Sequence, residues 1–149
     1  METIAVGVDG SEPATSALRW ALGHSEPGDL IRAVYVWQAY QGARHELLSA
    51  EELRRLRPQA DRVVREVVDS ALAGFDGPVA SVEAVNYFGH PGKWLVDLSG
   101  EVDLLVVGSR GQGGFRGLLL GSVSTYVVHH AHCPVVIVRP ERHRDADDD

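Results

Sequence analysis

Residues 103–138, DLLVVGSRGQGGFRGLLLGSVSTYVVHHAHCPVVIV, contain the pattern that decides the fold. An apolar run at 103–108, rich in β-branched valine, predicts a buried strand, and PVVIV at 134–138 predicts another. Between them lie a glycine-rich loop and a segment with apolar residues at helical spacing. That stripe comprises Val123, Tyr126, Val127, His130 and Ala131. A strand, a crossover helix and a second strand predict a parallel pair with a right-handed connection.

The same alternation extends over the rest of the chain. Further strands are predicted at 3–8, 30–37 and 79–88, and further helices after Ser11, from Pro58 and at 91–99. Nearly continuous apolar strands that alternate with amphipathic helices are typical of an α/β domain whose parallel sheet is covered on both faces. In such sheets, ligands bind beyond the carboxyl ends of the strands.

Several residues predict where the helices begin and end. Ser11 is a predicted N-cap and Pro13 suits a first helical turn. The apolar stripe that follows Pro58 ends before Gly74, which is a predicted helix stop. Within the segment 38–57, ELLSAEELRRLR is interpreted as a short helix, and Pro58 as a break or a new start.

Composition sets the domain count and argues against some partners. A chain of 149 residues with 44% hydrophobic and 23% charged residues predicts one globular domain, placed at 1–140. The last nine residues, ERHRDADDD, hold five acidic residues against two arginines, a net charge of −3, and predict a disordered acidic tail at 141–149. The formal net charge of −7 for the whole chain argues against nucleic acid as the main partner.

The N-terminus and the single cysteine predict a cytoplasmic protein. Cys133 is the only cysteine, so no intramolecular disulfide can form, which fits a reducing compartment. No basic segment precedes an apolar stretch at the N-terminus, and no run approaches the roughly 20 apolar residues that span a bilayer. We therefore expect no membrane association.

The stretch GSRGQGGFRGLLLGS at 108–122 holds six of the sixteen glycines of the chain. It lies between the end of the fourth predicted strand and the start of the last predicted helix. Free backbone N–H groups and the positive end of the helix dipole meet there, so the loop predicts a phosphate site. Ser122 and Ser124 supply hydroxyl donors, and Arg110 and Arg116 supply positive charge.

Three common nucleotide or phosphate motifs do not match the chain. A P-loop needs a lysine after its last glycine, but Lys93 is the only lysine and lies elsewhere. In the dinucleotide fingerprint a third glycine would stand at Arg116. A receiver-like phosphoacceptor site needs clustered acidic residues, and the chain offers only Asp9, with Asn86 near the end of the third strand.

The spacing Gly108-x2-Gly111-x9-Gly121-Ser122 resembles the signature of the universal stress protein family, in its ATP-binding branch. The stretches VGVDGSEPATSALRWAL, DLLVVGSRG and GSVSTYVVHHAHCPVVIVRP are similar to elements of that family, so the resemblance covers nearly the whole chain. It implies a Rossmann-like sheet of five parallel strands in the order 3-2-1-4-5. It also implies an ATP ligand, accompanied by Mg²⁺, at the switch point between strands one and four.

The resemblance also implies a set of nucleotide-binding residues. In it, the glycines and hydroxyls of the loop wrap the phosphates and ribose, Val36 contacts adenine, and Gly7 leaves room for close approach. Asp9 would bind a ribose hydroxyl or a base edge, or act through Mg²⁺; its alternative role is that of a turn residue. Arg110 is otherwise a solvated loop charge. The full set is Gly7, Asp9, Val36, Gly108, Ser109, Arg110, Gly111, Gly113, Gly114, Gly121, Ser122, Val123 and Ser124.

Histidines near the C-terminal end of the last helix do not predict a metal site. His129 and Cys133 share a helix face, whereas His130 belongs to the predicted apolar stripe and His132 follows the helix. Zinc needs convergent ligands and a fourth group. We interpret the segment as a helix end, where histidine is favoured, that leads into a strand. Nor does any nucleophile–base pair at a familiar spacing predict catalysis.

These expectations lead to a nucleotide-dependent regulatory module that binds ATP. One alternative is an ATPase or phosphotransferase that uses the same site, although no base beside the γ-phosphate is visible. A second is a nucleotide-free dimerising module, which would be expected to lack the glycine spacing. In the implied strand order, residues 135–138 form an apolar edge strand, and the resemblance implies a homodimer through it.

Overall fold

A computed structural model describes residues 1–38, 48–77, 79–111 and 119–140. Gly113, Gly114 and the predicted tail at 141–149 lie outside this part of the chain. Within it, five strands alternate with four helices. They are β1 (Thr3–Val8), α1 (Glu12–His24), β2 (Leu30–Trp37), α2 (Ala50–Leu72), β3 (Ser81–Phe88), α3 (Pro91–Ser99), β4 (Leu104–Gly108), α4 (Ser122–His130) and β5 (Val135–Val138). The predicted alternation is confirmed, with strand boundaries that differ by two residues or fewer.

The five strands form one parallel sheet in the order β3-β2-β1-β4-β5. The expected order is confirmed. β1 lies in the middle, and Ile4, Ala5 and Val6 are at most 1% exposed. A run of apolar side chains on both sides of one strand is stable only where both faces of the sheet are covered, which is why this strand is central.

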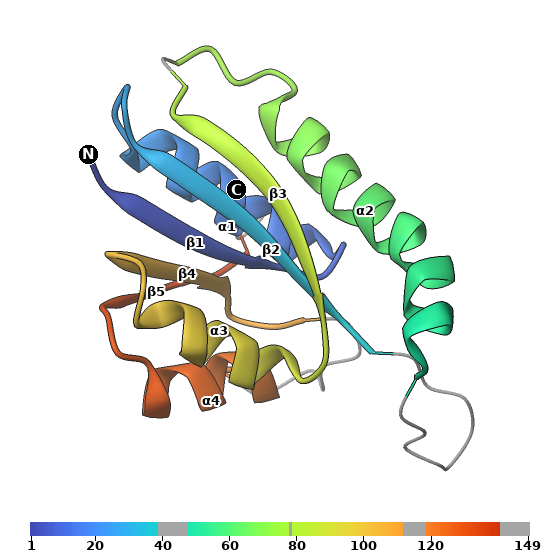
Figure 1. Cartoon of the computed structure of the whole chain (residues 1–149). Helices are drawn as coiled ribbons and strands as arrows, with labels where there is room; N and C mark the ends of the chain where they lie inside the picture. Colours follow the sequence, from blue (N-terminus) through green and yellow to red (C-terminus); the bar gives the residue numbers. More distant parts are fainter. Residues whose placement is uncertain (39–47, 78, 112–118, 141–149) are drawn as a thin grey trace, which may run out of the picture.

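Each face of the sheet is covered by two helices (Figure 1). Ile4, Val6 and Val8 point to the face covered by α1 and α2. Ala5 belongs to the cluster on the other face, where α3 and α4 pack. Because successive side chains of a strand alternate between faces, one short apolar strand serves both halves of the core.

Helix α2 corrects the expectation at Pro58. The helix does not break there but continues from Ala50 to Leu72 with Pro58 inside it. Proline removes the N–H that would bond to the carbonyl of Arg54. Both residues are exposed, so that carbonyl lies on the solvent side of the helix, while Ala60, Val64, Val67 and Ala71 hold the opposite face against the sheet. Gly74 follows the helix with φ +73°, as the predicted stop requires.

Helix α4 corrects a second expectation, because His130 is exposed rather than in the core stripe. Its ring stacks on Tyr126 with centroids 4.4 Å apart. The buried positions of the helix are Ser124 and Val127. The hydroxyl of Ser124 donates to the carbonyls of Ser109 and Gly121, each at 3.1 Å, which rotates the helix and turns His130 outward.

None of the helices in the described residues is both long and apolar enough to cross a membrane. The longest of them, α2, has 23 residues and a charged outer face.

Candidate functional site

The candidate site lies at the carboxyl edge of the sheet, where β1 and β4 are neighbours. The chain leaves β1 for α1 on one face and leaves β4 for α4 on the other face. This divergence of two adjacent connections is the switch point at which open α/β sheets bind ligands. Both helices begin at this edge, so their N–H ends point toward the site.

Asp9 follows β1 and faces the glycine-rich loop. Its Oδ1 accepts hydrogen bonds from the backbone N–H of Ser11, at 2.9 Å, and from the Ser11 hydroxyl. Its Oδ2 lies 2.7 Å from the position that a Cβ on Gly111 would occupy. Glycine is therefore required at 111, since any side chain there would displace the carboxylate. Asp9 takes part both in the turn before α1, as its alternative role predicted, and in the wall of the site.

The N-terminus of α4 is built to receive an anion. Gly121 is the N-cap and offers no side chain to the first N–H groups of the helix. Its own N–H donates to the carbonyl of Ser109 at 2.7 Å. The hydroxyl of Ser124 is already engaged with two carbonyls, so it fixes the helix start, whereas Ser122 is exposed at the first helical position. Uncapped N–H groups at a helix N-terminus bind phosphate readily.

Arg110 carries a buried donor without an acceptor. Among the described residues, its Nε is buried and has no hydrogen-bond partner. A guanidinium is always charged, and a buried donor without an acceptor costs free energy. Gly121 lies next to Arg110, since a Cβ at 121 would be 3.4 Å from the Arg110 Cα. An anion at the α4 N-terminus would supply the missing acceptor.

Gly7 and Gly108 are needed for packing around the site. A Cβ on Gly108 would lie 3.2 Å from the backbone of Pro13, so glycine lets the first turn of α1 cross the end of β4 closely. A Cβ on Gly7 would lie 3.0 Å from the side chain of Leu95 and 3.2 Å from that of Val107. These two glycines bring α1 and α3 close to the strands at the switch point.

The carbonyl of Val36 points past the end of β1. In a parallel strand, backbone groups of successive residues alternate between the two neighbours. The carbonyl of Trp37 accepts from Gly89 on the β3 side, at 3.0 Å, so that of Val36 faces β1. However, β1 pairs with β2 only as far as Val8 and Tyr35. The Val36 carbonyl is thus an acceptor that faces the site, while its side chain is 8% exposed and packs on the α3 face.

Two aromatic residues of β2 face α2 beside the site. Burial raises the pKa of the Tyr35 hydroxyl above its ordinary 10.0, and the negative charge of Asp9 adds to this, so the two side chains are neighbours. Tyr35 and Trp37 line a cavity of about 270 Å³ under α2. A larger hollow of about 420 Å³ lies along charged residues of α2 between Pro58 and Asp69, outside the switch point.

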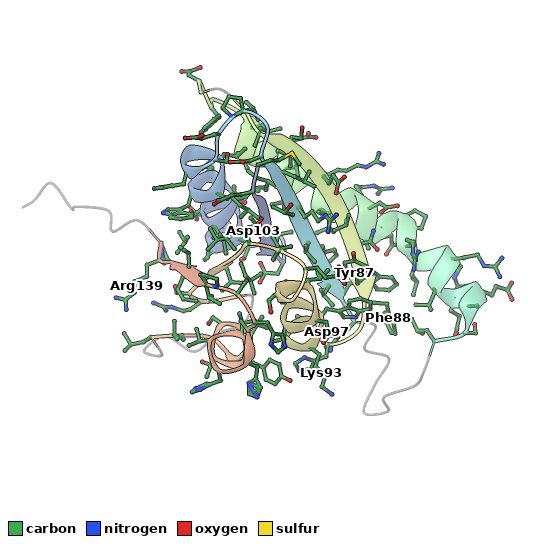
Figure 2. All side chains as sticks on the ribbon, turned by 60° about the vertical axis from the view of Figure 1, so that its left-hand side comes forward. Tyr87, Phe88, Lys93, Asp97, Asp103 and Arg139 are labelled. Atoms are coloured by element: carbon green, nitrogen blue, oxygen red, sulfur yellow. The ribbon has the colours of Figure 1, made fainter. Side chains whose placement is uncertain are left out.

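Aromatic residues also close the edge where β3 meets α3. Figure 2 shows Tyr87 and Phe88 at the end of β3, close to α3, which carries Lys93 and Asp97. Tyr87 stacks on Trp94 of α3 with centroids 4.3 Å apart, and the Trp94 indole N–H donates to the carbonyl of Phe88 at 3.0 Å. These contacts fix the first turn of α3 against the sheet.

The histidines near Cys133 do not converge. His129 and His130 are exposed, and the backbone N–H of His132 donates to the hydroxyl of Ser99 at 2.8 Å. The thiol of Cys133 donates to the carbonyl of Pro134 at 3.3 Å. No group of three or more metal-ligating side chains is found in the described ranges.

Sequence reasoning missed the part that Tyr35, Trp37 and Asn86 play at this edge. Tyr35 and Trp37 read as ordinary strand residues, and Asn86 was noted only because it is not an aspartate. A signal was present in the lengths, since the second strand has two more residues than the first. Which strand outruns its neighbour depends on register, and register is set across the sheet.

Comparison with known proteins agrees with this fold. A family model described as the universal stress protein family matches residues 1–139. The universal stress proteins Rv1996 and Rv2623 of Mycobacterium tuberculosis are 34% and 35% identical to the chain over 158 and 161 residues. Those matches cover 96% and 93% of this chain but 49% and 48% of the relatives, so the chain spans about half the length of these curated relatives.

Solved structures show the same fold. The hypothetical protein MJ0577 matches with a TM-score of 0.70 at 19% identity, over 95% of this chain and 97% of its own. A universal stress protein in complex with cAMP matches with a TM-score of 0.61 at 28% identity, over 93% and 96%. A family member from Arabidopsis thaliana with AMP bound matches with a TM-score of 0.63 at 21% identity, over 99% and 97%.

Proposed function

The chain belongs to the universal stress protein family, and from that premise we propose that it binds ATP at the switch point and acts as a nucleotide-dependent regulatory module. Family membership alone leaves open whether a nucleotide binds. The proposal therefore depends on what the residues at the carboxyl edge offer to phosphate, ribose and base.

The unpaired Nε of Arg110 beside the uncapped N-terminus of α4 is the observation that carries the proposal. A polyphosphate chain there accepts bonds from the N–H groups at the start of α4 and from the guanidinium. Charge-assisted bonds of this kind are about twice as strong as neutral ones. Several of them favour a nucleotide with more phosphates, which is why we propose ATP rather than AMP.

The base and ribose ends of the site support the same ligand. The carbonyl of Val36 accepts a hydrogen bond from an exocyclic amino group such as that of adenine. The Asp9 carboxylate stands between this carbonyl and the phosphate loop, within reach of a ribose hydroxyl. The solved relative at 28% identity is described as a complex with cAMP, which is also an adenine nucleotide.

We propose that Mg²⁺ accompanies the nucleotide. This hard cation prefers oxygen ligands and is usually held by one or two carboxylates together with substrate phosphates. Asp9 is the carboxylate at the switch point, and it offsets the repulsion between its own charge and the phosphates only if a cation lies between them. In the described residues, no cluster of protein ligands would hold a metal without the phosphates.

Regulation follows from the two ends of the glycine-rich loop. ATP shifts a conformational equilibrium only by its differential affinity for two states. Gly108 and Gly111 are tied to α1 and Asp9, and Gly121 is tied to α4, so a phosphate between them links the connections on both faces of the sheet. A homodimer through β5 is the proposed assembly, and the proposed domain ends at residue 140.

The test is to denature the protein, purified without added nucleotide, and to identify what it releases. Stoichiometric ATP supports the proposal. Release of ADP, with turnover of added ATP, would replace it by an ATPase or phosphotransferase. Release of nothing, together with no calorimetric binding of added Mg²⁺–ATP, would leave a nucleotide-free module and overturn the proposal.

A further inference from the structure

We propose that Asn86, held by Asp61, is a positioning residue for base recognition. Through Trp37 it fixes the carbonyl of Val36, and it thereby makes the site select a base that presents an amino group rather than an oxo group. This inference rests on the nucleotide site proposed above and adds to it a determinant of base selectivity.

The end of β2 is supported from one side only. Val36 and Trp37 pair with Tyr87 and Phe88 of β3. On the other side, β1 has ended at Val8. A strand end with a single neighbour is held less firmly than a strand inside a sheet, so side-chain contacts decide where the Val36 carbonyl points.

Asn86 supplies those contacts. The indole N–H of Trp37 donates to Asn86 Oδ1 at 3.0 Å. The amide nitrogen of Asn86 donates to Asp61 Oδ1. Asp61 lies on α2, one turn after Pro58, so the chain of bonds ties α2, β3 and the end of β2 together.

Asparagine is the side chain that this arrangement needs. The indole of Trp37 can only donate, and an ionised Asp61 can only accept. A side chain between them must accept on one side and donate on the other, which fixes the orientation of the Asn86 amide. An aspartate at 86 would place two carboxylates together, and a leucine would leave the Trp37 N–H without an acceptor.

Packing alone does not fix Trp37. Phe88 touches the indole on one side, edge to face, with centroids 5.0 Å apart. On the side of α2, Trp37 lines the cavity of about 270 Å³ together with Leu56 and Gln59. The ring therefore has room to move, and its bond to Asn86 is what holds it and the backbone beside it.

The consequence is a choice between two bases of the same shape. Adenine presents an amino group where hypoxanthine presents an oxo group. The Val36 carbonyl accepts from the amino group and faces the oxo group as acceptor against acceptor. An unpaired buried acceptor costs enough to change affinity by about tenfold. Selectivity requires the carbonyl to stay in place, and this is the part that Asn86 plays.

The test compares ATP, ITP and inorganic tripolyphosphate by calorimetry in the wild type and in Asn86→Leu. The wild type is expected to bind ATP about tenfold more tightly than ITP. In Asn86→Leu this ratio should fall to near one, because ATP affinity drops while ITP and tripolyphosphate affinities stay unchanged. Asp61→Leu should lower the ratio in the same direction, and it decides the matter if Asn86→Leu does not fold.

Two control variants separate positioning from general stability. Glu83→Leu breaks another side-chain pair between β2 and β3, the 3.2 Å contact from Arg32 Nε to Glu83 Oε2, and should keep the wild-type ratio. Asp61→Asn keeps an acceptor for Asn86 and should also keep it.

The outcomes separate this inference from the proposed function. Folded Asn86→Leu or Asp61→Leu protein with the wild-type ratio overturns the inference, as does an equal loss of all three ligands. A wild type that binds no ATP and no tripolyphosphate overturns the proposed nucleotide site itself. A wild type that binds ATP and ITP equally overturns base selection alone.

Discussion

The Oδ2 atom of Asp9 lies 2.7 Å from the place where Gly111 would carry a Cβ. The carboxylate at the end of β1 and the loop after β4 are therefore in contact across the switch point, and the contact exists only because residue 111 lacks a side chain. Replacing Gly111 forces either the carboxylate or the loop backbone to move. The glycine spacing thus serves the position of Asp9 as well as access for phosphate.

Gly121→Asp is expected to abolish ATP binding without unfolding the protein. Gly121 has φ −75° and ψ 176°, which any residue adopts, and an added Cβ would come no closer than 3.4 Å to another residue. Aspartate is a favourable N-cap, so the new carboxylate takes the N–H groups that phosphate needs and repels phosphate as well. Affinity should fall by about a hundredfold or more, as several kcal/mol imply. Calorimetry measures this, with circular dichroism as the folding check.

Gly23→Asp is the matched control for that variant. Gly23 is exposed near the end of α1, and no atom lies within 4 Å of an added Cβ. It introduces the same charge at the opposite edge of the sheet, and ATP affinity should equal that of the wild type. If folded Gly121→Asp protein also binds like the wild type, the α4 N-terminus is not the phosphate site.

Arg110→Gln should weaken ATP binding by about tenfold, the size expected for one charge-assisted hydrogen bond. AMP should lose less, because it brings less negative charge to the guanidinium. The free energy of unfolding should stay the same or rise, since the change removes a buried unpaired donor. Arg19→Gln, which removes the 2.9 Å bond from α1 to the Ser70 carbonyl, is the control for lost charge. Unchanged ATP affinity in Arg110→Gln would assign the Arg110 charge to solvent.

Ile137→Pro is expected to convert the proposed dimer to a monomer. The carbonyls of Pro134 and Val138 accept from Leu105 and Ser109 of β4, so the backbone N–H of Ile137 points to the free edge of β5. Proline removes that donor and is tolerated at such an edge position. Light scattering at tens of micromolar protein reports the assembly.

Ile137→Ala controls for the lost side chain. Ile137 is partly buried against the α3 face, so both variants lose its packing, but alanine keeps the N–H. The alanine variant should remain a dimer. A monomeric wild type, or a dimeric proline variant, contradicts an assembly through this edge.

Stability should fall in acid through Asp29. Its carboxylate accepts from the backbone N–H of Glu2 at 2.7 Å and of Glu26 at 2.8 Å, and these bonds hold its pKa below the ordinary 3.8. A lowered pKa contributes stability that is present above the unfolded-state value and lost as pH falls through the folded-state value. Urea midpoints of the wild type and Asp29→Asn should therefore differ at neutral pH and converge below pH 3.8. A gap that is independent of pH would exclude this carboxylate as the cause.

Periodicity in the sequence determined the strands, most of the helices and the parallel sheet, because burial on one or two faces imposes a spacing on apolar residues. The glycine spacing and its resemblance to a family supplied the strand order and located the loop at the carboxyl edge. Gly74 was read correctly as a helix stop, since a positive φ is a property of the local chain.

The tertiary structure alone decided the features that depend on neighbours distant in sequence. Helix α2 continues through Pro58 because its other face is packed on the sheet, and His130 faces solvent because Ser124 bonds to the end of β4. The Val36 carbonyl faces the site because β1 ends before β2, and Asn86 matters because Asp61 and Trp37 reach it from two other elements. Spacing along a chain records which residues are buried, whereas register, helix rotation and hydrogen-bond partners are fixed only when separate elements pack together.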